Sequence, residues 1–377
     1  MDFTLTTYQK LLTTLKNQEY TFQPFAEAIE KPRANTIILR HDVDLHPENA
    51  LRTAKIEQSL GIRSTYFFRI IPETFKPEII QQIADLGHEI GYHYEDLTLA
   101  GEEVGGQKSE VGDQKSEVGG QKSENGDRRS EVRSQEKKGK GKNKEEIGTG
   151  AESLPGSCRG PRGAQGQKTE NRNHVETHGR ASIKRNPRRD KACLVSCLVS
   201  RLFPKKTNPP ENKNILIDHA YQLFCHHLEQ LRQYADIKTI CMHGSPKSRY
   251  DSKDIWENRQ GAGQEYDYRQ LGIIGEPYFD IDFDQVFYLT DTGRRWDGWK
   301  VSLRDKVPQQ ERWEKEGLVF HSTKDIIKAA ENNQLPGKIM ITTHPQRWTD
   351  KPLPWLKELV WQGVKNVGKR ILVARGR

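Results

Sequence analysis

Two carboxylates and an imidazole follow a short apolar run near the N-terminus. His41, Asp42 and Asp44 come directly after residues 37–40, which read Ile-Ile-Leu-Arg. Alternate residues of an extended chain share a face, so Asp42 and Asp44 are expected to point the same way. Clustered charge at the end of a buried strand needs a metal, a partner or a substrate to satisfy it. One carboxylate can hold a cation while the other takes a proton from water, which is the machinery of metal-assisted hydrolysis.

A structural alternative exists for the same residues. Pro47 and Glu48 are typical of the first turn of a helix, and aspartates just before such a turn often cap it. On this interpretation Asp42 and Asp44 are helix caps at the end of an ordinary strand. The motif by itself does not decide between the two interpretations.

Polar residues of the same kinds end four other predicted strands. They are His93 in the strand over residues 88–94, His243 at the end of 237–243, Asp291 after 285–290 and His344 at the end of 338–344. In folds built from repeated βα units, active residues gather at the carboxyl ends of the strands. Five strand ends with such residues therefore predict one convergent polar site.

The elements that must position these residues alternate between helix and strand. Repeated βα units indicate a parallel sheet or barrel with covered faces. The predicted helices are residues 4–15, 47–60, 77–86, 218–234 and 323–332, and the predicted strands are residues 36–40, 64–70, 88–94, 237–243, 285–290 and 338–344.

Residues 101–213 have a different composition from the rest of the chain. A seven-residue pattern, first seen at residues 104–110, recurs twice and then decays, with too few apolar residues for a coiled coil. We expect this stretch to be a disordered insertion between residues 1–100, the first part of a barrel, and residues 214–377, its second part with a C-terminal helix. The stretch has 25 lysine and arginine residues against 16 acidic ones, which leaves 35 against 36 elsewhere. The folded part therefore gives no electrostatic case for a nucleic-acid partner.

The remaining composition excludes several classes of protein. No run approaches the roughly 18 apolar residues that a membrane span needs, and no secretory signal opens the chain. The five cysteines have no CxxC spacing, so neither a disulfide framework nor a zinc knuckle is indicated. A cytoplasmic protein is the expectation.

Together these residues resemble the polysaccharide deacetylases, carbohydrate esterase family 4, over residues 36–97 and 237–348. His41-Asp42-Val43-Asp44 is similar to the family's first motif, and residues 87–93, Gly-His-Glu-Ile-Gly-Tyr-His, are similar to its second. The resemblance implies an α/β fold, a distorted (β/α)7 barrel, and a divalent metal, with zinc preferred. It assigns the catalytic base to Asp42 and metal ligands to Asp44 and His93.

The resemblance also implies roles for residues after the insertion. His344 matches the general acid, and Asp291 is expected to orient it. Trp296, with its neighbour Arg295, is assigned to the carbohydrate substrate, although tryptophans at such positions are equally often packed in a core.

One position departs from the family pattern. The second metal-binding histidine is expected four residues after His93, where this chain has Leu97. We take His243 as the third ligand instead, with Glu95 and His88 as the other candidates. The predicted function is a metal-dependent hydrolase that removes an acetyl group from an N- or O-acetylated carbohydrate, such as a biosynthetic intermediate. An amidase acting on another C–N bond and an inactive carbohydrate-binding barrel are the alternatives.

Overall fold

Parallel strands form the only sheet among the residues described by the computed structural model, which are 1–104, 213–244, 248–257, 266–302 and 306–374. The predicted insertion falls almost wholly outside these ranges, and all described residues belong to one unit. The strands are β1 (Thr21–Gln23), β2 (Thr36–Val43), β3 (Thr65–Phe68), β4 (Glu89–Tyr94), β5 (Ile240–Met242), β6 (Phe287–Thr290) and β7 (Lys338–Thr343).

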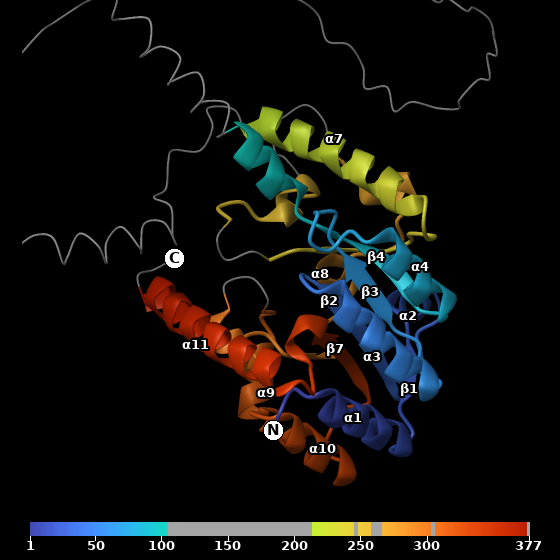
Figure 1. Ribbon diagram of the computed structural model, residues 1–377, viewed down its shortest axis with the longest axis vertical. Coiled ribbons are helices and arrows are strands. Elements are labelled where there is room, and N and C mark those ends of the chain that lie inside the picture. Colours follow the sequence, from blue (N-terminus) through green and yellow to red (C-terminus); the bar gives the residue numbers. More distant parts are fainter. Residues whose placement is uncertain (105–212, 245–247, 258–265, 303–305, 375–377) are drawn as a thin grey trace, which may run out of the picture. The chain divides into compact units, whose positions relative to one another are not determined.

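The order of the strands places β2 in the middle of the sheet. It runs β5-β4-β3-β2-β7-β6, and β1 pairs with the first half of β2 on the side where β3 pairs with its second half. No ladder joins β5 to β6 in the described part of the chain, so the sheet is an open half-barrel (Figure 1). The predicted α/β fold is thus confirmed as a curled parallel sheet with helical cover. Because every pair is parallel, the carboxyl ends of the strands share one edge.

Helices connect the strands and cover the sheet. They are α1 (Leu5–Asn17), α2 (Phe25–Glu30), α3 (Pro47–Ser59), α4 (Pro77–Asp85), a helix over residues 96–104, α7 (Lys213–Arg232), α8 (Pro277–Asp280), α9 (Gln310–Lys315), α10 (Thr323–Glu331) and α11 (Pro352–Ala374). Helices α10, α1, α3 and α4 pack in a row, each against the next (Figure 1). None of the described helices has the length and apolar content to span a bilayer.

Local sequence explains the burial of β2 and the positions at which helices α10 and α3 begin. Every residue of β2 is buried, as its run of isoleucine, leucine and valine predicts for a central parallel strand. Helix α10 begins with a capping box in which Ser322 and Asp325 exchange hydrogen bonds. Helix α3 begins at Pro47, and its N-cap is His46, not an aspartate. Asp42 and Asp44 are therefore not the caps of α3.

Candidate metal centre and catalytic residues

Three side chains from β2, β4 and β5 meet at the carboxyl edge of the sheet, where β3 lies between β2 and β4. Asp44 follows β2, His93 lies near the end of β4, and His243 follows β5. One ligand atom from each of these residues lies within 4.8 Å of the others, as a metal-binding group requires. These are the three residues for which the sequence predicts metal ligation, including the replacement of Leu97 by His243. Leu97 itself is buried in the apolar core.

The distances within this group match the spacing of zinc ligands. Asp44 Oδ1 lies 3.4 Å from His93 Nε2 and 3.2 Å from His243 Nδ1, and the two nitrogens are 3.2 Å apart. Three ligands held at ~2.0–2.1 Å by a tetrahedral ion are about 3.3–3.4 Å from one another. The pairwise distances are therefore compatible with the ligands of a divalent ion such as Zn²⁺.

A hydrogen bond to the backbone orients His93 for ligation. Its Nδ1 lies 2.9 Å from the carbonyl oxygen of Cys241, which can only accept, so Nδ1 carries a proton and Nε2 faces Asp44. Metal-binding histidines commonly have such a partner on the second nitrogen. Burial opposes protonation of His93, but the carboxylates of Asp42 and Asp44 outweigh it and raise its pKa.

The Asp44 carboxyl group is kept ionised by its neighbours. Burial alone would raise the pKa of this group, yet His243, His93 and His344 together hold it well below its usual value. An ionised carboxylate among imidazoles is a donor set suited to zinc and similar ions.

Asp42 lies beside the group, on the inner face of the sheet. Its Oδ2 accepts a hydrogen bond from Arg40 at 2.9 Å and lies 4.0 Å from His93 Nε2. Its Oδ1 is buried and has no hydrogen-bond partner in the described part of the chain. Arg40 is itself fully buried, over the rings of Phe67 and Tyr278. Arg40 therefore fixes the carboxylate while leaving one oxygen available.

His344 and Asp291 form a second buried pair at the same edge. Asp291 Oδ1 lies 2.6 Å from His344 Nδ1, and its Oδ2 accepts the backbone N–H of His344 at 3.0 Å. Trp348 and Arg347 also donate to this carboxylate. Burial acts in the opposite direction, but Arg347 and His344 lower the pKa of Asp291 to about 2.

Asp44, a member of the metal-binding group, also lies next to the His344–Asp291 pair. His344 Nε2 lies 3.8 Å from Asp44 Oδ2, and Gln346 Nε2 donates to the same oxygen at 3.3 Å. The two histidine ligand candidates face the other oxygen, Oδ1. Asp44 thus stands between the metal-binding group on one side and His344 on the other.

His41 has a different position from the two aspartates of its motif. Its Nδ1 lies 2.6 Å from Thr343 Oγ1 and its Nε2 lies 2.8 Å from Glu57 Oε1, on helix α3. Tyr8 also donates to Glu57. Burial raises the pKa of Glu57, but His41 and the other donors outweigh it, so the pKa is lowered overall. His41 is therefore part of a buried network between the sheet and α3.

The other two ligand candidates are held elsewhere. His88 contacts Ser64 and the carbonyl oxygen of Ala54, within the network of Glu57. Glu95 Oε1 accepts a hydrogen bond from Arg69 Nε at 2.7 Å, and its Oε2 lies 4.0 Å from His243 Nε2. Glu95 is thus a neighbour of the metal-binding group. His88 instead belongs to the buried network around Glu57.

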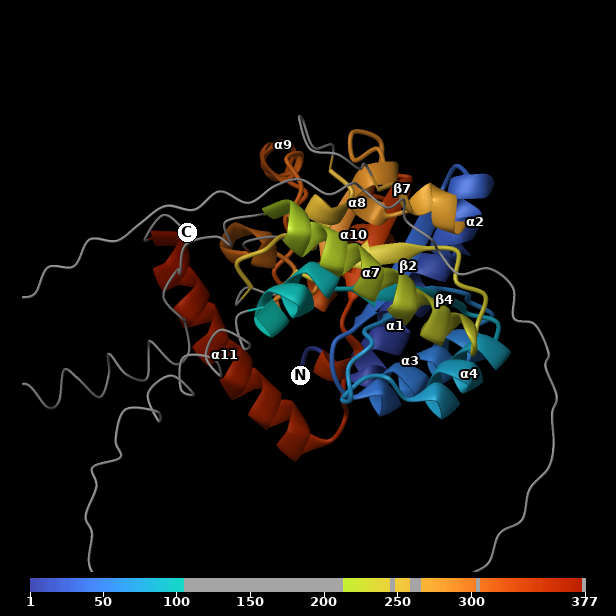
Figure 2. The same cartoon turned by 90° about the horizontal axis from the view of Figure 1, so that it is seen from above.

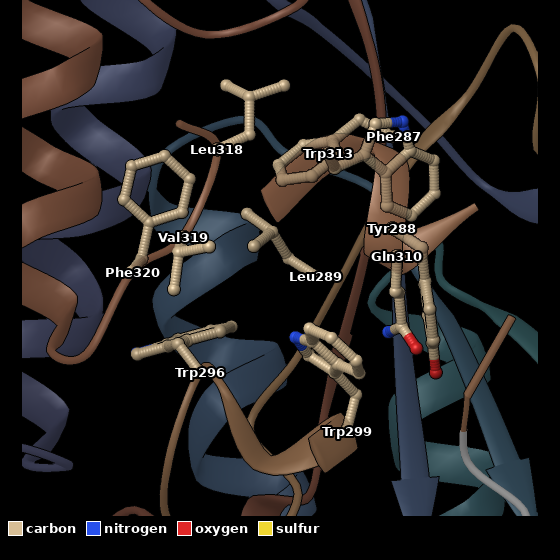
Figure 3. Close-up of a pocket in the computed structure, with 10 residues that line it drawn as sticks. All are labelled: Phe287, Tyr288, Leu289, Trp296, Trp299, Gln310, Trp313, Leu318, Val319 and Phe320. Carbon is tan, nitrogen blue, oxygen red and sulfur yellow. The ribbon is translucent and has the colours of Figure 1, made fainter. Parts of the chain in front are cut away.

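Trp296 and Arg295 make their contacts away from this group. Trp296 is 2% exposed, donates to Thr323 and packs near Phe3 and Trp348. Figure 3 shows it with Trp299 at one side of an aromatic cavity of about 10 Å³, room for roughly one water molecule. Arg295 pairs with Asp297 through two bonds of 2.8 Å. These placements agree with the packing interpretation of Trp296.

Sequence reasoning did not find two charged neighbours of the group. Arg69 follows β3 directly, and its Nη1 donates to the backbone oxygen of Asp44 at 3.2 Å. Arg40 precedes Asp42 by two residues on the same strand and shares its face. The rule that polar residues gather at strand ends would have included Arg69, and the alternation of β2 would have paired Arg40 with Asp42.

The fold and site define an α/β protein with a parallel half-barrel and buried histidine and aspartate groups that could hold a metal. Comparisons of this chain with known protein families, with curated proteins and with solved structures gave no match.

Proposed function

We propose that the protein is a metal-dependent hydrolase that removes an acetyl group from an N- or O-acetylated carbohydrate. The main support is the spacing of Asp44, His93 and His243, which suits a tetrahedral divalent ion. A divalent ion at such a site acts as a Lewis acid toward a carbonyl oxygen and makes water more acidic. The carbohydrate part of the proposal, and a barrel of the deacetylase type, rest on the resemblance of the motifs at residues 41–44 and 87–93.

The roles of the remaining residues follow from the positions of their side-chain oxygen and nitrogen atoms that could exchange a proton with water or substrate. Asp42 Oδ1, which has no hydrogen-bond partner among the described residues, would accept a proton from the attacking water. Arg40 would hold that carboxylate in place. His344, oriented through Nδ1 by Asp291, would give a proton from Nε2 to the departing amine or alkoxide. Water and the acetylated sugar are consumed, and acetate and the free amine or hydroxyl are released.

The test is release of acetate from N- and O-acetylated sugars by the zinc-loaded protein. Asp42→Asn should lower turnover by about 10²–10⁴-fold while zinc remains bound, because the base is lost and the ligands are retained. Asp236→Asn, at an exposed position, is the matched control. Zinc binding without acetate release, and with release of another amine from simple amides, would favour the amidase. No affinity for divalent ions would rule out both enzymes.

A further inference from the structure

Helix α11 is oriented against the usual pattern of surface helices. A surface helix normally turns its apolar side to the core and its polar side to water. In α11 the side toward the body includes Gln362, which is only 4% exposed, and Asn366, which donates to the carbonyl oxygen of Gly293 at 3.0 Å. Most of its large apolar side chains up to residue 366 face outward instead.

The outward face is a continuous apolar stripe. Leu353, Leu356, Val360 and Val364 follow each other at intervals of three, four and four residues, which places them along one side of the helix. Their exposed fractions are 78%, 52%, 60% and 59%. Trp361 widens the stripe and is 50% exposed. We call these five side chains the α11 stripe. A contiguous exposed patch of this kind marks an interaction site.

The helix is attached to the body, so the stripe belongs to the folded unit. The indole nitrogen of Trp355 donates to the backbone oxygen of Asp2 at 2.7 Å, and Arg294 Nη1 donates to the backbone oxygen of Trp355 at 2.8 Å. The two ribbon views show α11 at the edge of the molecule, with no described helix or strand over its outer flank (Figures 1 and 2).

The described charges along the stripe are mostly positive. Among residues 351–366, whose side chains the structure describes, three are lysines and one, Glu358, is acidic. Lys351, Lys357 and Lys365 are exposed, and the Nζ of Lys365 lies 5.3 Å from the ring centre of Trp361. Apolar side chains with tryptophan, bordered by lysines, are typical of helices that lie in the interface of an anionic bilayer.

We propose that α11 docks this stripe into the surface of an anionic phospholipid bilayer. The apolar side chains would enter the boundary between headgroups and acyl chains, and the lysines would contact lipid phosphates. A second copy of the chain fits the stripe less well, because two such segments would bring like charges together. This inference is independent of the proposed hydrolase activity.

Vesicle flotation of the full chain tests the proposal. The protein should float with vesicles of equal parts phosphatidylglycerol and phosphatidylcholine, and remain behind with phosphatidylcholine alone. The double variant Leu356→Ser/Val360→Ser should bind the anionic vesicles at least about tenfold more weakly, because it loses two apolar contacts. It keeps every lysine and arginine, so basic residues elsewhere in the chain contribute equally to both proteins.

Ile215→Ser is the matched control, because Ile215 is an apolar residue that is 63% exposed on α7. It should leave binding unchanged. Unfolding midpoints of all three proteins should agree, since the substituted side chains are exposed. Equal vesicle binding by the double variant and the unsubstituted protein would overturn the proposal. So would a dimer, measured by light scattering, that the double variant abolishes while neither protein binds vesicles.

Discussion

Asp291 holds His344 at two points, the ring nitrogen Nδ1 at 2.6 Å and the backbone nitrogen at 3.0 Å. Asp291 follows β6 and His344 follows β7, so the contact joins two neighbouring strands at their carboxyl ends. The double contact fixes both the position and the ring orientation of His344. Its other nitrogen, Nε2, is left on the side of Asp44.

Removing the charge of Asp291 should therefore disable His344. Asp291→Asn replaces an oxygen acceptor with an amide and disturbs the ring orientation, so acetate release should fall at least about a hundredfold. Zinc affinity should be unchanged, because the ligand candidates do not contact Asp291. Asp297→Asn, six residues later and paired with Arg295, is the control and should keep its activity. Full activity of the Asp291 variant would show that His344 does not act as the acid.

Glu276 should make stability depend on pH near neutrality. Burial outweighs the hydrogen bonds that this carboxylate accepts from the backbone of Met242 and Tyr278, and it raises the pKa from 4.5 to about 7. The folded state then binds a proton more tightly than the unfolded state. Its contribution to stability is fully present below about pH 4.5 and is lost as the pH rises to about 7, a change of up to about 3 kcal/mol.

Urea unfolding of Glu276→Gln between pH 5 and 8 checks this expectation. The glutamine does not titrate, so the stability advantage of the unsubstituted protein over the variant should shrink as the pH rises. Glu229→Gln, at an exposed position of α7, should show no such trend. An advantage that stays constant or grows with pH would contradict the raised pKa.

Much of the site was predictable because parallel strands bring their carboxyl ends together. That rule predicted that these strand ends converge on one site, although 300 residues of sequence separate Asp44 from His344. The family resemblance supplied the pairing of Asp291 with His344 and the ligand roles of Asp44 and His93. The sequence also predicted most helices and strands to within a few residues. Helices α2, α8 and α9 and strand β1 were not predicted, because elements of three to six residues have too few positions for a periodic pattern. The helix over residues 96–104 was not predicted either, because residues from 101 onward were assigned to the insertion.

The direction of individual side chains was harder to predict. Within one buried strand, His41 and Asp42 are adjacent and point to opposite faces, and both faces are polar there. The pattern of residue types does not tell which face holds a structural network and which a site. Trp296 illustrates the same limit, because a tryptophan suits a sugar-binding surface and an aromatic core equally well. Only the packing partners distinguish the two.

The buried network of Glu57, between β2 and α3, should contribute to the stability of the fold and not to zinc binding or catalysis. Glu57→Ala removes the partner of His41, Tyr8 and Ser64 at a fully buried position, so the free energy of unfolding should fall by about 3–5 kcal/mol. Gln58→Ala, next to it on the exposed side of α3, should change stability by less than about 0.5 kcal/mol. Equal effects of the two substitutions in urea unfolding would contradict this role.

Calorimetric titration of the metal-free full chain with Zn²⁺ tests the metal centre most directly. The unsubstituted protein should bind an ion at a site whose affinity falls at least about a hundredfold in Asp44→Asn and in His243→Gln, since each removes one of three ligands. Asp236→Asn should bind as the unsubstituted protein does. Zinc held by histidines or cysteines elsewhere in the chain contributes equally to all four proteins. Equal affinity in the His243 variant, or no binding by any of them, would contradict a metal centre formed by Asp44, His93 and His243.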